Sequence, residues 1–284
     1  MSPRDVGAIY SQDRPIVNRP IVPDWENLTK TAYNPDFGQA SLGSGMTTFL
    51  RRDADWSDNS TRARPMMQGR RPQANLVAVP FPAFDEAAAG LAATARAFHA
   101  RGWAPATAGN YSAVLSLDPL RLAISASGAD KGTLDSGHFV TVDADGRRVS
   151  GSGRPSDETA LHLAVVLGRG AGAVLHTHSV WGTVLSQATR DGAVVLSGLE
   201  LLKGLSGVKT HEHVEHVPVI DNTQDYGRLA TAVSGALAAY PECHGLLLRG
   251  HGLYAWGADL AEARRHVEAL EFLFEVVGRL AGRT

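Results

Sequence analysis

Cysteine is almost absent from this sequence of 284 residues, since Cys243 is the only one. A single thiol excludes a disulfide within the chain and cysteine-based zinc fingers. No run approaches the roughly 18 apolar residues of a membrane span, and the opening residues include Asp5 and Asp13, which argues against a secretory signal. The net charge of −2 gives no basic field for nucleic acid. We therefore expect a cytoplasmic protein without nucleic-acid or membrane partners.

The first quarter of the chain also lacks hydrophobic periodicity. Up to about residue 75, proline, arginine, aspartate and serine are scattered without a sustained period of 3.6 or 2 residues. Such a composition buries too little apolar surface to offset the chain entropy lost on folding. We therefore expect residues 1–75 to be a disordered extension and residues 76–284 to form the folded domain.

Strand and helix patterns are intermixed from Phe84 onward, and several neighbouring strands have connections of hairpin length. Short connections favour antiparallel pairing, whereas a pure βαβ winding needs a crossover between strands. The pattern predicts an α/β fold with a mixed, largely antiparallel central sheet and helices on both faces. Helices are expected over residues 85–101, 156–167, 180–188, 226–240 and 260–280, and strands over residues 111–117, 122–125, 139–143, 171–175, 217–220, 245–248 and 253–256.

Histidines mark the strongest candidate site. His176 and His178 end a short apolar strand, where alternate side chains point the same way and reach one metal ion. His251 follows another buried strand and stands between two glycines, which permit a sharp turn. Three histidines without cysteine fit zinc with an open fourth position; the alternative is surface histidines at a strand end. A second pair, His211 and His213, has no such partner, and we expect a solvated loop there.

Two carboxylates are candidates for proton transfer. Glu158 lies in the first turn of a helix that Ser156 is expected to cap, and its alternative role is that of an acid favoured by the helix dipole. Glu200 lies among leucines. A carboxylate in such a stretch either faces water at a helix edge or occupies a pocket that raises its pKa.

Two loops have the composition of an anion site. Gly109 and Asn110 follow the first helical segment, and Ser127 and Gly128 follow a strand, with Lys131 three residues further on. Hydroxyls, free backbone N–H groups and a cation together bind phosphate well. The alternative is a pair of ordinary turns with a surface lysine.

Taken in this order, the motifs resemble the class II aldolase family, over residues 84–281. Within it, the stretches that surround Glu200 and follow His251 are most similar to a dehydratase branch that serves methionine salvage. The motifs that carry the resemblance are the Gly109-Asn110 loop, the Ser127-Gly128 loop with Lys131, the Pro155-Ser156 helix with Glu158, His176-Thr-His178, Gly198-Leu-Glu200, Thr210-His-Glu-His213, Pro218-Val-Ile-Asp-Asn222, Arg249-Gly-His251-Gly and Gly252-Leu-Tyr-Ala-Trp256.

The resemblance implies a three-layer catalytic domain and a homotetramer with sites near the contacts between subunits. It also implies one zinc ion per subunit on His176, His178 and His251, and phosphate contacts from the two loops.

Glu200 is implied as the catalytic acid and base, and Glu158 matches a catalytic or metal-approaching glutamate of the aldolases. The implied reaction removes water from a ketose that carries a 1-phosphate. Two alternatives remain: a sugar-phosphate aldolase or pentulose-phosphate epimerase that relies on Glu158, and a non-enzymatic scaffold of the same fold.

Overall fold

The computed structural model describes residues 81–282, so the expectation for residues 1–75 lies outside the described residues. No helix within this range is long and apolar enough to cross a membrane. The helices are α1 (Phe84–Ala100), α2 (Thr159–Arg169), α3 (Val180–Ala188), α4 (Tyr226–Ala239) and α5 (Leu260–Ala281), with 3₁₀ turns η2 (Ser136–His138) and η3 (Glu200–Gly204). The strands are β1 (Asn110–Leu117), β2 (Leu120–Ser125), β3 (Phe139–Val142), β4 (Arg148–Ser150), β5 (Ala173–Thr177), β6 (Ala193–Leu196), β7 (Glu215–Ile220), β8 (Gly245–Leu248) and β9 (Gly252–Gly257).

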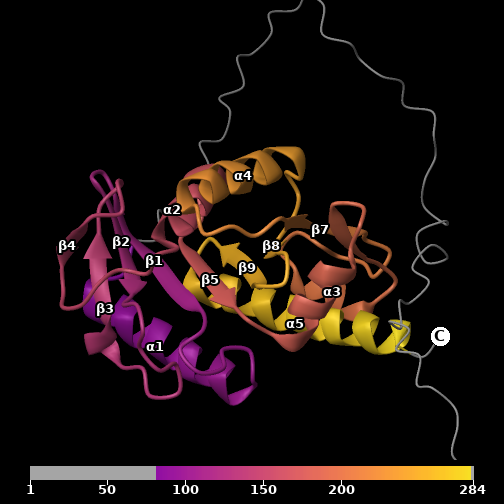
Figure 1. Ribbon diagram of the computed structural model, residues 1–284, viewed down its shortest axis with the longest axis horizontal. Helices are drawn as coiled ribbons and strands as arrows, with labels where there is room; N and C mark the ends of the chain where they lie inside the picture. Colours follow the sequence, from indigo (N-terminus) through magenta and orange to yellow (C-terminus); the bar gives the residue numbers. More distant parts are fainter. Residues whose placement is uncertain (1–80, 283–284) are drawn as a thin grey trace, which may run out of the picture. The chain divides into compact units, whose positions relative to one another are not determined.

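The strands form one sheet in the order β4-β3-β2-β1-β5-β9-β8-β7-β6 (Figure 1). Every neighbouring pair is antiparallel except β7 and β8. At the centre, His176 of β5 lies opposite Asn110 of β1 on one side and Tyr254 of β9 on the other. The end of β5 is therefore flanked on both sides by strands that bring polar side chains to it.

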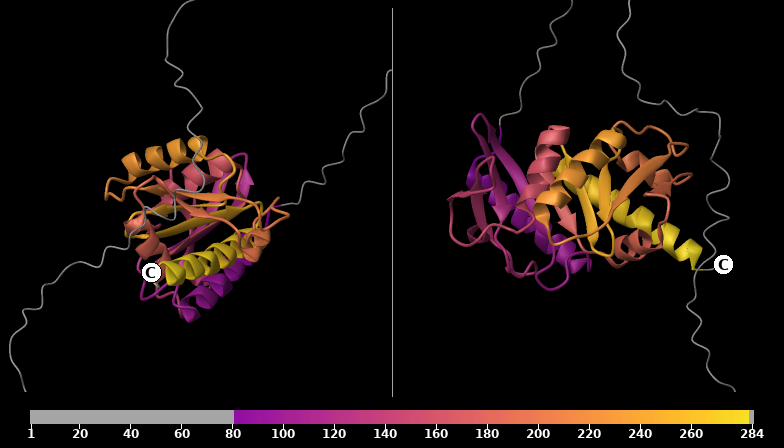
Figure 2. Two further views of the ribbon diagram at one scale, coloured as in Figure 1. Left: turned by 90° about the vertical axis from the view of Figure 1, so that its right-hand side faces the viewer. Right: turned by 45° about the horizontal axis from the view of Figure 1, so that its top comes forward.

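Helices cover both faces of this sheet, as Figure 2 shows in its left-hand view. On one face α2 packs against α4 over a core that includes Val114, Leu161 and Val174. On the other face α5 packs along β9 and against α3, while α1 packs on β1. The predicted architecture, a mixed and largely antiparallel sheet between two helical layers, is confirmed.

Helix α5 is the main support of the second face. Its buried residues Ala263, Val267, Leu270 and Phe274 recur every three or four positions, which places them on one stripe of the helix. Asp259 caps its start, with the side chain accepting a hydrogen bond from the Glu262 N–H at 2.8 Å. This packing holds the helix directly behind β5 and β9.

Candidate metal centre and active site

Three imidazoles converge at the end of β5, a central strand of the sheet. His176 belongs to β5, His178 follows it, and His251 lies in the turn between β8 and β9. Pairing of Thr177 with Leu253 brings that turn beside the end of β5. The ring centroids of the three histidines lie 4.4–4.9 Å apart. The structure therefore brings together the three residues that the sequence singled out.

The spacing of their nitrogen atoms suits one small metal ion. Nε2 of His251 lies 3.4 Å from Nε2 of His176 and 3.1 Å from Nε2 of His178. Ligands of a tetrahedral zinc ion, each at about 2.0–2.1 Å from the metal, lie roughly 3.3 Å apart. Among residues 81–282, no other group of three histidine, cysteine, aspartate or glutamate side chains is close enough to hold a metal.

The protonation of these rings also suits a cation. Burial and the neighbouring imidazoles hold the pKa of His176 well below its usual range. Burial, His251 and Lys131 lower the pKa of His178 to about 4. Nδ1–H of His176 donates to the Leu253 carbonyl at 2.9 Å, which leaves the Nε2 lone pair free to face the cluster. Neutral rings with converging lone pairs form a donor set for a divalent cation.

A glycine lets the turn that carries His251 approach the strand. A Cβ added to Gly252 would lie 1.9 Å from the Thr177 carbonyl oxygen and 3.2 Å from a ring carbon of His176. Any side chain there would therefore push the turn away from β5. This close approach gives a physical reason for the glycine that follows His251.

Glu158 places a carboxylate beside the histidines. It is buried, and its two oxygens lie 3.4 Å from Nε2 of His176 and 3.4 Å from Nε2 of His251. Glu158 is the N-cap residue of α2, but its side chain makes no cap hydrogen bond. The expected cap at Ser156 is also displaced: α2 begins at Thr159, and the Ser156 hydroxyl accepts from the Glu158 N–H at 3.3 Å. The carboxylate therefore lies at the histidine cluster, where it can take part in proton transfer.

The Gly109-Asn110 loop contributes to this cluster through its amide. Asn110 is buried and its Nδ2 donates to Glu158 Oε2 at 2.5 Å. Gly109 has a φ of +84°, and a Cβ there would lie 2.7 Å from the His176 carbonyl oxygen. The loop thus packs directly against β5, and its Asn110 side chain binds the Glu158 carboxylate.

Lys131 ties the two predicted anion-binding loops together. Its side chain is buried, and Nζ donates to the carbonyls of Thr107 at 2.9 Å and Ala129 at 2.8 Å. An ammonium group has three donors, so one remains for a ligand. Burial lowers the pKa of Lys131, and nearby Asp130 opposes that change. The alternative of an ordinary surface lysine is excluded by this burial.

Arg154 is a candidate anion-binding residue that sequence reasoning missed. Its Nη2 donates to Ser127 Oγ at 2.9 Å, and its carbonyl accepts from the Ser127 N–H at 2.9 Å. Its guanidinium also pairs with Asp157. The signal was a basic residue directly before the Pro155-Ser156 motif. These contacts join the Ser127-Gly128 loop to the segment that carries Glu158.

Glu200 lies outside this cluster within the chain. β6 ends at Leu196, opposite Glu215 at the start of β7, whereas His251 follows the end of β8, which runs parallel to β7. The Glu200 side chain is 71% exposed, pairs with Lys203, and lies 3.9 Å from His211. Of the two alternatives for Glu200, the water-facing one is observed in this chain, and the hydrogen bond from Lys203 lowers the pKa of Glu200.

The second His-x-His pair lies beside a buried carboxylate. Nε2 of His213 lies 2.9 Å from Glu215, and Nδ1 of His244 lies 3.1 Å from the same carboxylate oxygen. Although burial opposes it, hydrogen bonding with these histidines keeps the pKa of Glu215 below its usual range. His211 instead contacts Glu200. This pair belongs to none of the metal-ligand groups in the described part of the chain.

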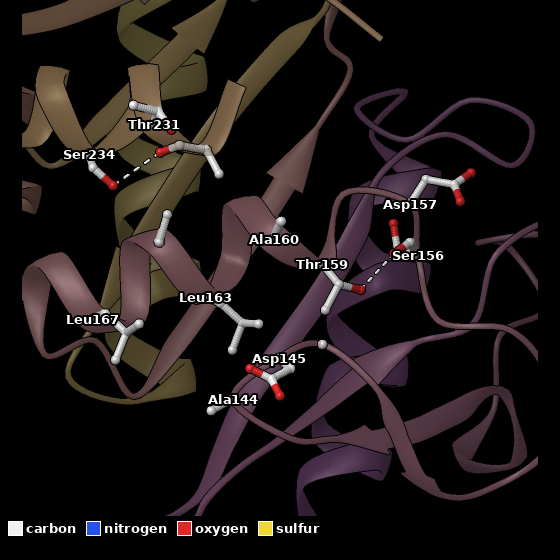
Figure 3. A pocket seen from close by; sticks show the side chains of 13 residues that line it. Ala144, Asp145, Ser156, Asp157, Thr159, Ala160, Leu163, Leu167, Thr231 and Ser234 are labelled. Atoms are coloured by element: carbon white, nitrogen blue, oxygen red, sulfur yellow. Dashed lines mark hydrogen bonds between the residues drawn. The ribbon is translucent and has the colours of Figure 1, made fainter. Parts of the chain in front are cut away.

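A groove of about 540 Å³ lies elsewhere, between α2, α4 and the β3–β4 turn (Figure 3). Its lining includes Asp145, Ser156, Leu163 and Ser234, and none of the three clustered histidines. This groove therefore does not mark the candidate site. The converging ligands and the buried carboxylate do.

Comparisons with known proteins agree with this geometry. Residues 89–277 match the model of the class II aldolase and adducin N-terminal domain family. Methylthioribulose-1-phosphate dehydratase of Pseudomonas aeruginosa (strain LESB58) is 49% identical over 63% of this chain and 87% of its own length. The enzyme of that name from Sorangium cellulosum (strain So ce56) is 48% identical over 69% and 92%.

The solved structures agree on the fold. The crystal structure of YgbL from Klebsiella pneumoniae superposes with a TM-score of 0.61 and 27% identity, over 72% of this chain and 93% of that one. The residues that match the family model, 89–277, contain the three histidines, Glu158, Glu200 and both loops. The chain therefore belongs to the class II aldolase family and, within it, to the group of the methylthioribulose-1-phosphate dehydratases.

Proposed function

We propose that this chain is a hydro-lyase that dehydrates 5-methylthioribulose 1-phosphate to 2,3-diketo-5-methylthiopentyl 1-phosphate in methionine salvage. One observation carries the proposal: a three-histidine cluster with Glu158 beside it, in a chain about half identical to dehydratases over most of their length. We further infer that the enzyme acts in the cytoplasm as a homotetramer.

Zinc is the metal proposed for His176, His178 and His251, because three nitrogen ligands with an open fourth position suit its catalytic sites. When bound, it supplies the Lewis acidity that polarises the carbon-2 carbonyl and makes the carbon-3 proton removable. Restoring activity to chelated protein with zinc, with magnesium as the control ion, tests this choice. Equal recovery with magnesium would contradict it, since that ion prefers oxygen ligands.

The phosphate is assigned to the two loops beside the cluster. Lys131 offers its remaining N–H, and Ser127, Gly128 and Arg154 offer hydroxyl, backbone and guanidinium donors. Asn110 joins these loops to the carboxylate. A phosphate held here places the ketose beside Glu158 and the three histidines.

Removal of water needs two proton transfers: a base removes the carbon-3 proton, and an acid protonates the departing carbon-4 hydroxyl. The enol so formed then tautomerises to the 2,3-diketone. Glu158 is assigned to the first, since its oxygens lie beside Nε2 of His176 and His251. Glu200 is assigned to the second. Because its side chain is exposed in its own chain, we propose that it serves the site of a neighbouring copy, where burial against that copy would raise its pKa and let it hold a proton.

Subunit mixing tests this assignment of Glu200. Glu200→Gln chains keep the histidines but lack the acid, and His251→Ala chains keep Glu200 but lack a metal ligand. Each variant alone should therefore be inactive. Mixed oligomers formed by unfolding and refolding together regain up to about a quarter of wild-type activity, because sites between unlike neighbours are complete. If Glu200 acted within its own chain, mixing would restore nothing.

The burial of Glu158 also favours a second candidate, the sugar-phosphate aldolase or epimerase, since such a carboxylate can serve as the main base. That reading expects Glu158 to be essential and Glu200 to be nearly neutral. An aldolase would also release dihydroxyacetone phosphate from a ketose 1-phosphate, whereas an epimerase would return an isomer of its substrate. Turnover of both variants with both substrates separates the two functions.

A further inference from the structure

A row of buried polar side chains lies behind Glu158, and two of its members, Ser112 and His162, have no part in the proposed reaction. Ser112 and Asn110 belong to β1 and His162 to α2, and all three are buried. Ser112 Oγ lies 2.7 Å from His162 Nδ1, and His162 Nε2 contacts Asn110 Oδ1. Asn110 Nδ2 then donates to Glu158 Oε2 at 2.5 Å. The four side chains form one continuous hydrogen-bonded row that ends at the carboxylate.

The chemistry of each group fixes the direction of this row. A carboxylate oxygen accepts, so Asn110 turns its NH₂ toward Glu158 and its Oδ1 toward His162. An amide oxygen only accepts, so Nε2 of His162 carries the hydrogen. Burial lowers the pKa of His162 to about 3, so the ring is neutral and Nδ1 accepts from the Ser112 hydroxyl. Every donor in the row therefore points toward Glu158.

We propose that Ser112 and His162 are positioning residues that fix the Asn110 amide and, through it, aim Glu158 at the reacting carbon. An asparagine amide presents either NH₂ or oxygen after a half turn, and its oxygen would repel the carboxylate. The Nε2–H of His162 holds the amide in the productive orientation. Aligned hydrogen bonds also polarise one another, which strengthens the final donor.

Aromatic packing joins the same row to a metal ligand. The Tyr254 ring stacks on the His176 ring with centroids 4.0 Å apart. It also makes an edge-to-face contact with the His162 ring, whose centroid lies 5.6 Å away. His162 is thus held between Tyr254, Ser112 and Asn110 without solvent exposure. A fully buried ring so placed has little freedom to turn, as a positioning role requires.

A matched pair of substitutions tests the proposal, which rests on the proposed function because Glu158 must transfer a proton. His162→Gln retains a donor where Nε2–H stood, whereas His162→Asn reaches only the Nδ1 position. We expect His162→Asn to lower kcat about 10- to 100-fold with a smaller change in KM and with bound zinc retained. His162→Gln should recover most of that loss. Equal kcat values in the two variants, or a loss that follows zinc content, would overturn the proposal.

Serine substitutions on β1 provide a second test with less risk to folding. Ser112→Ala removes the first donor of the row, and Ser116→Ala on the same strand touches no residue of it. We expect Ser112→Ala to lower kcat by a smaller factor than His162→Asn, and Ser116→Ala to leave it unchanged. Equal kcat in both serine variants would contradict a role for Ser112.

The tautomer of His162 is measured without substrate. In nitrogen-15 NMR spectra of the zinc-loaded protein, with His162→Gln used for assignment, we expect a neutral ring with the hydrogen on Nε2 throughout pH 5–8. A hydrogen on Nδ1, or protonation within this range, would overturn the proposal. If the tautomer is as expected but the wild type does not turn over 5-methylthioribulose 1-phosphate, the proposed function fails and the geometry stands.

Discussion

A buried acid on α5 makes the stability of the protein depend on pH in an unusual direction. Glu271 is fully buried, and it accepts hydrogen bonds from Thr177 at 2.5 Å and from Ser179. Burial raises the pKa of Glu271 from 4.5 to about 7 against those two hydrogen bonds. The fold therefore prefers the protonated acid, and the contribution of Glu271 to stability falls as the pH rises toward and through 7.

Replacing Glu271 by Gln should remove this cost of ionisation. A shift from 4.5 to about 7, at roughly 1.4 kcal/mol per pKa unit, amounts to about 3 kcal/mol at pH 8 and to about 1 kcal/mol at pH 5. Glu271→Gln should thus raise the free energy of unfolding by up to about 3 kcal/mol at pH 8, and by much less at pH 5. The part of the stability difference that does not depend on pH comes from burying a neutral amide in place of a neutral acid.

Urea unfolding of zinc-free protein, followed by tryptophan fluorescence at both pH values, measures this difference. Glu275→Gln is the matched control, because Glu275 is a half-exposed residue of the same helix that pairs with Arg279. It should change stability by about 0.5 kcal/mol or less at either pH. If Glu271→Gln were as stable as the wild type at pH 8, or if its gain did not depend on pH, the reasoning about burial would be refuted.

Three further predictions concern the site. His251→Ala should lose most bound zinc, whereas His213→Ala, which alters only the Glu215 cluster, should keep it; metal analysis of both decides this, and the reverse result would move the metal site. Lys131→Met should raise KM for the phosphorylated substrate more than it lowers kcat, as loss of uniform binding does; unchanged steady-state kinetics would contradict the phosphate assignment. Glu158→Gln should keep zinc but lower kcat by roughly 10²–10⁴-fold; near-wild-type turnover would show that Glu158 is not the base.

The sequence predicted the elements that have strong periodicity. Helix α5, strand β5 and the two strands that flank His251, β8 and β9, were expected within a few residues of their observed bounds. Strands β4 and β6 were missed because each has only three or four residues and too little alternation to distinguish it from a loop. The longer segments with regular hydrophobic periodicity were enough to predict the fold class. The two missed strands lie at the edges of the sheet and only extend it.

Side-chain direction was the part that the sequence left open. The sequence offered Glu158 as a capping acid or as a site residue, and the fold places its carboxylate beside the histidines. The leucines around Glu200 left open whether it faces water or a pocket; in the fold Leu202 is buried, whereas the Glu200 carboxylate is exposed and pairs with Lys203. His162 lies between Leu161 and Leu163 and gave no signal, because its partners come from a distant strand.

The most direct test of the account is the product formed from 5-methylthioribulose 1-phosphate. Wild-type and His251→Ala protein are incubated with this substrate and zinc, and the products are identified by mass spectrometry. We predict that the wild type yields a diketone phosphate lighter than the substrate by one water, and that His251→Ala yields none. Unchanged substrate with zinc-loaded wild type, or a three-carbon phosphate from cleavage of a carbon–carbon bond, would contradict the account.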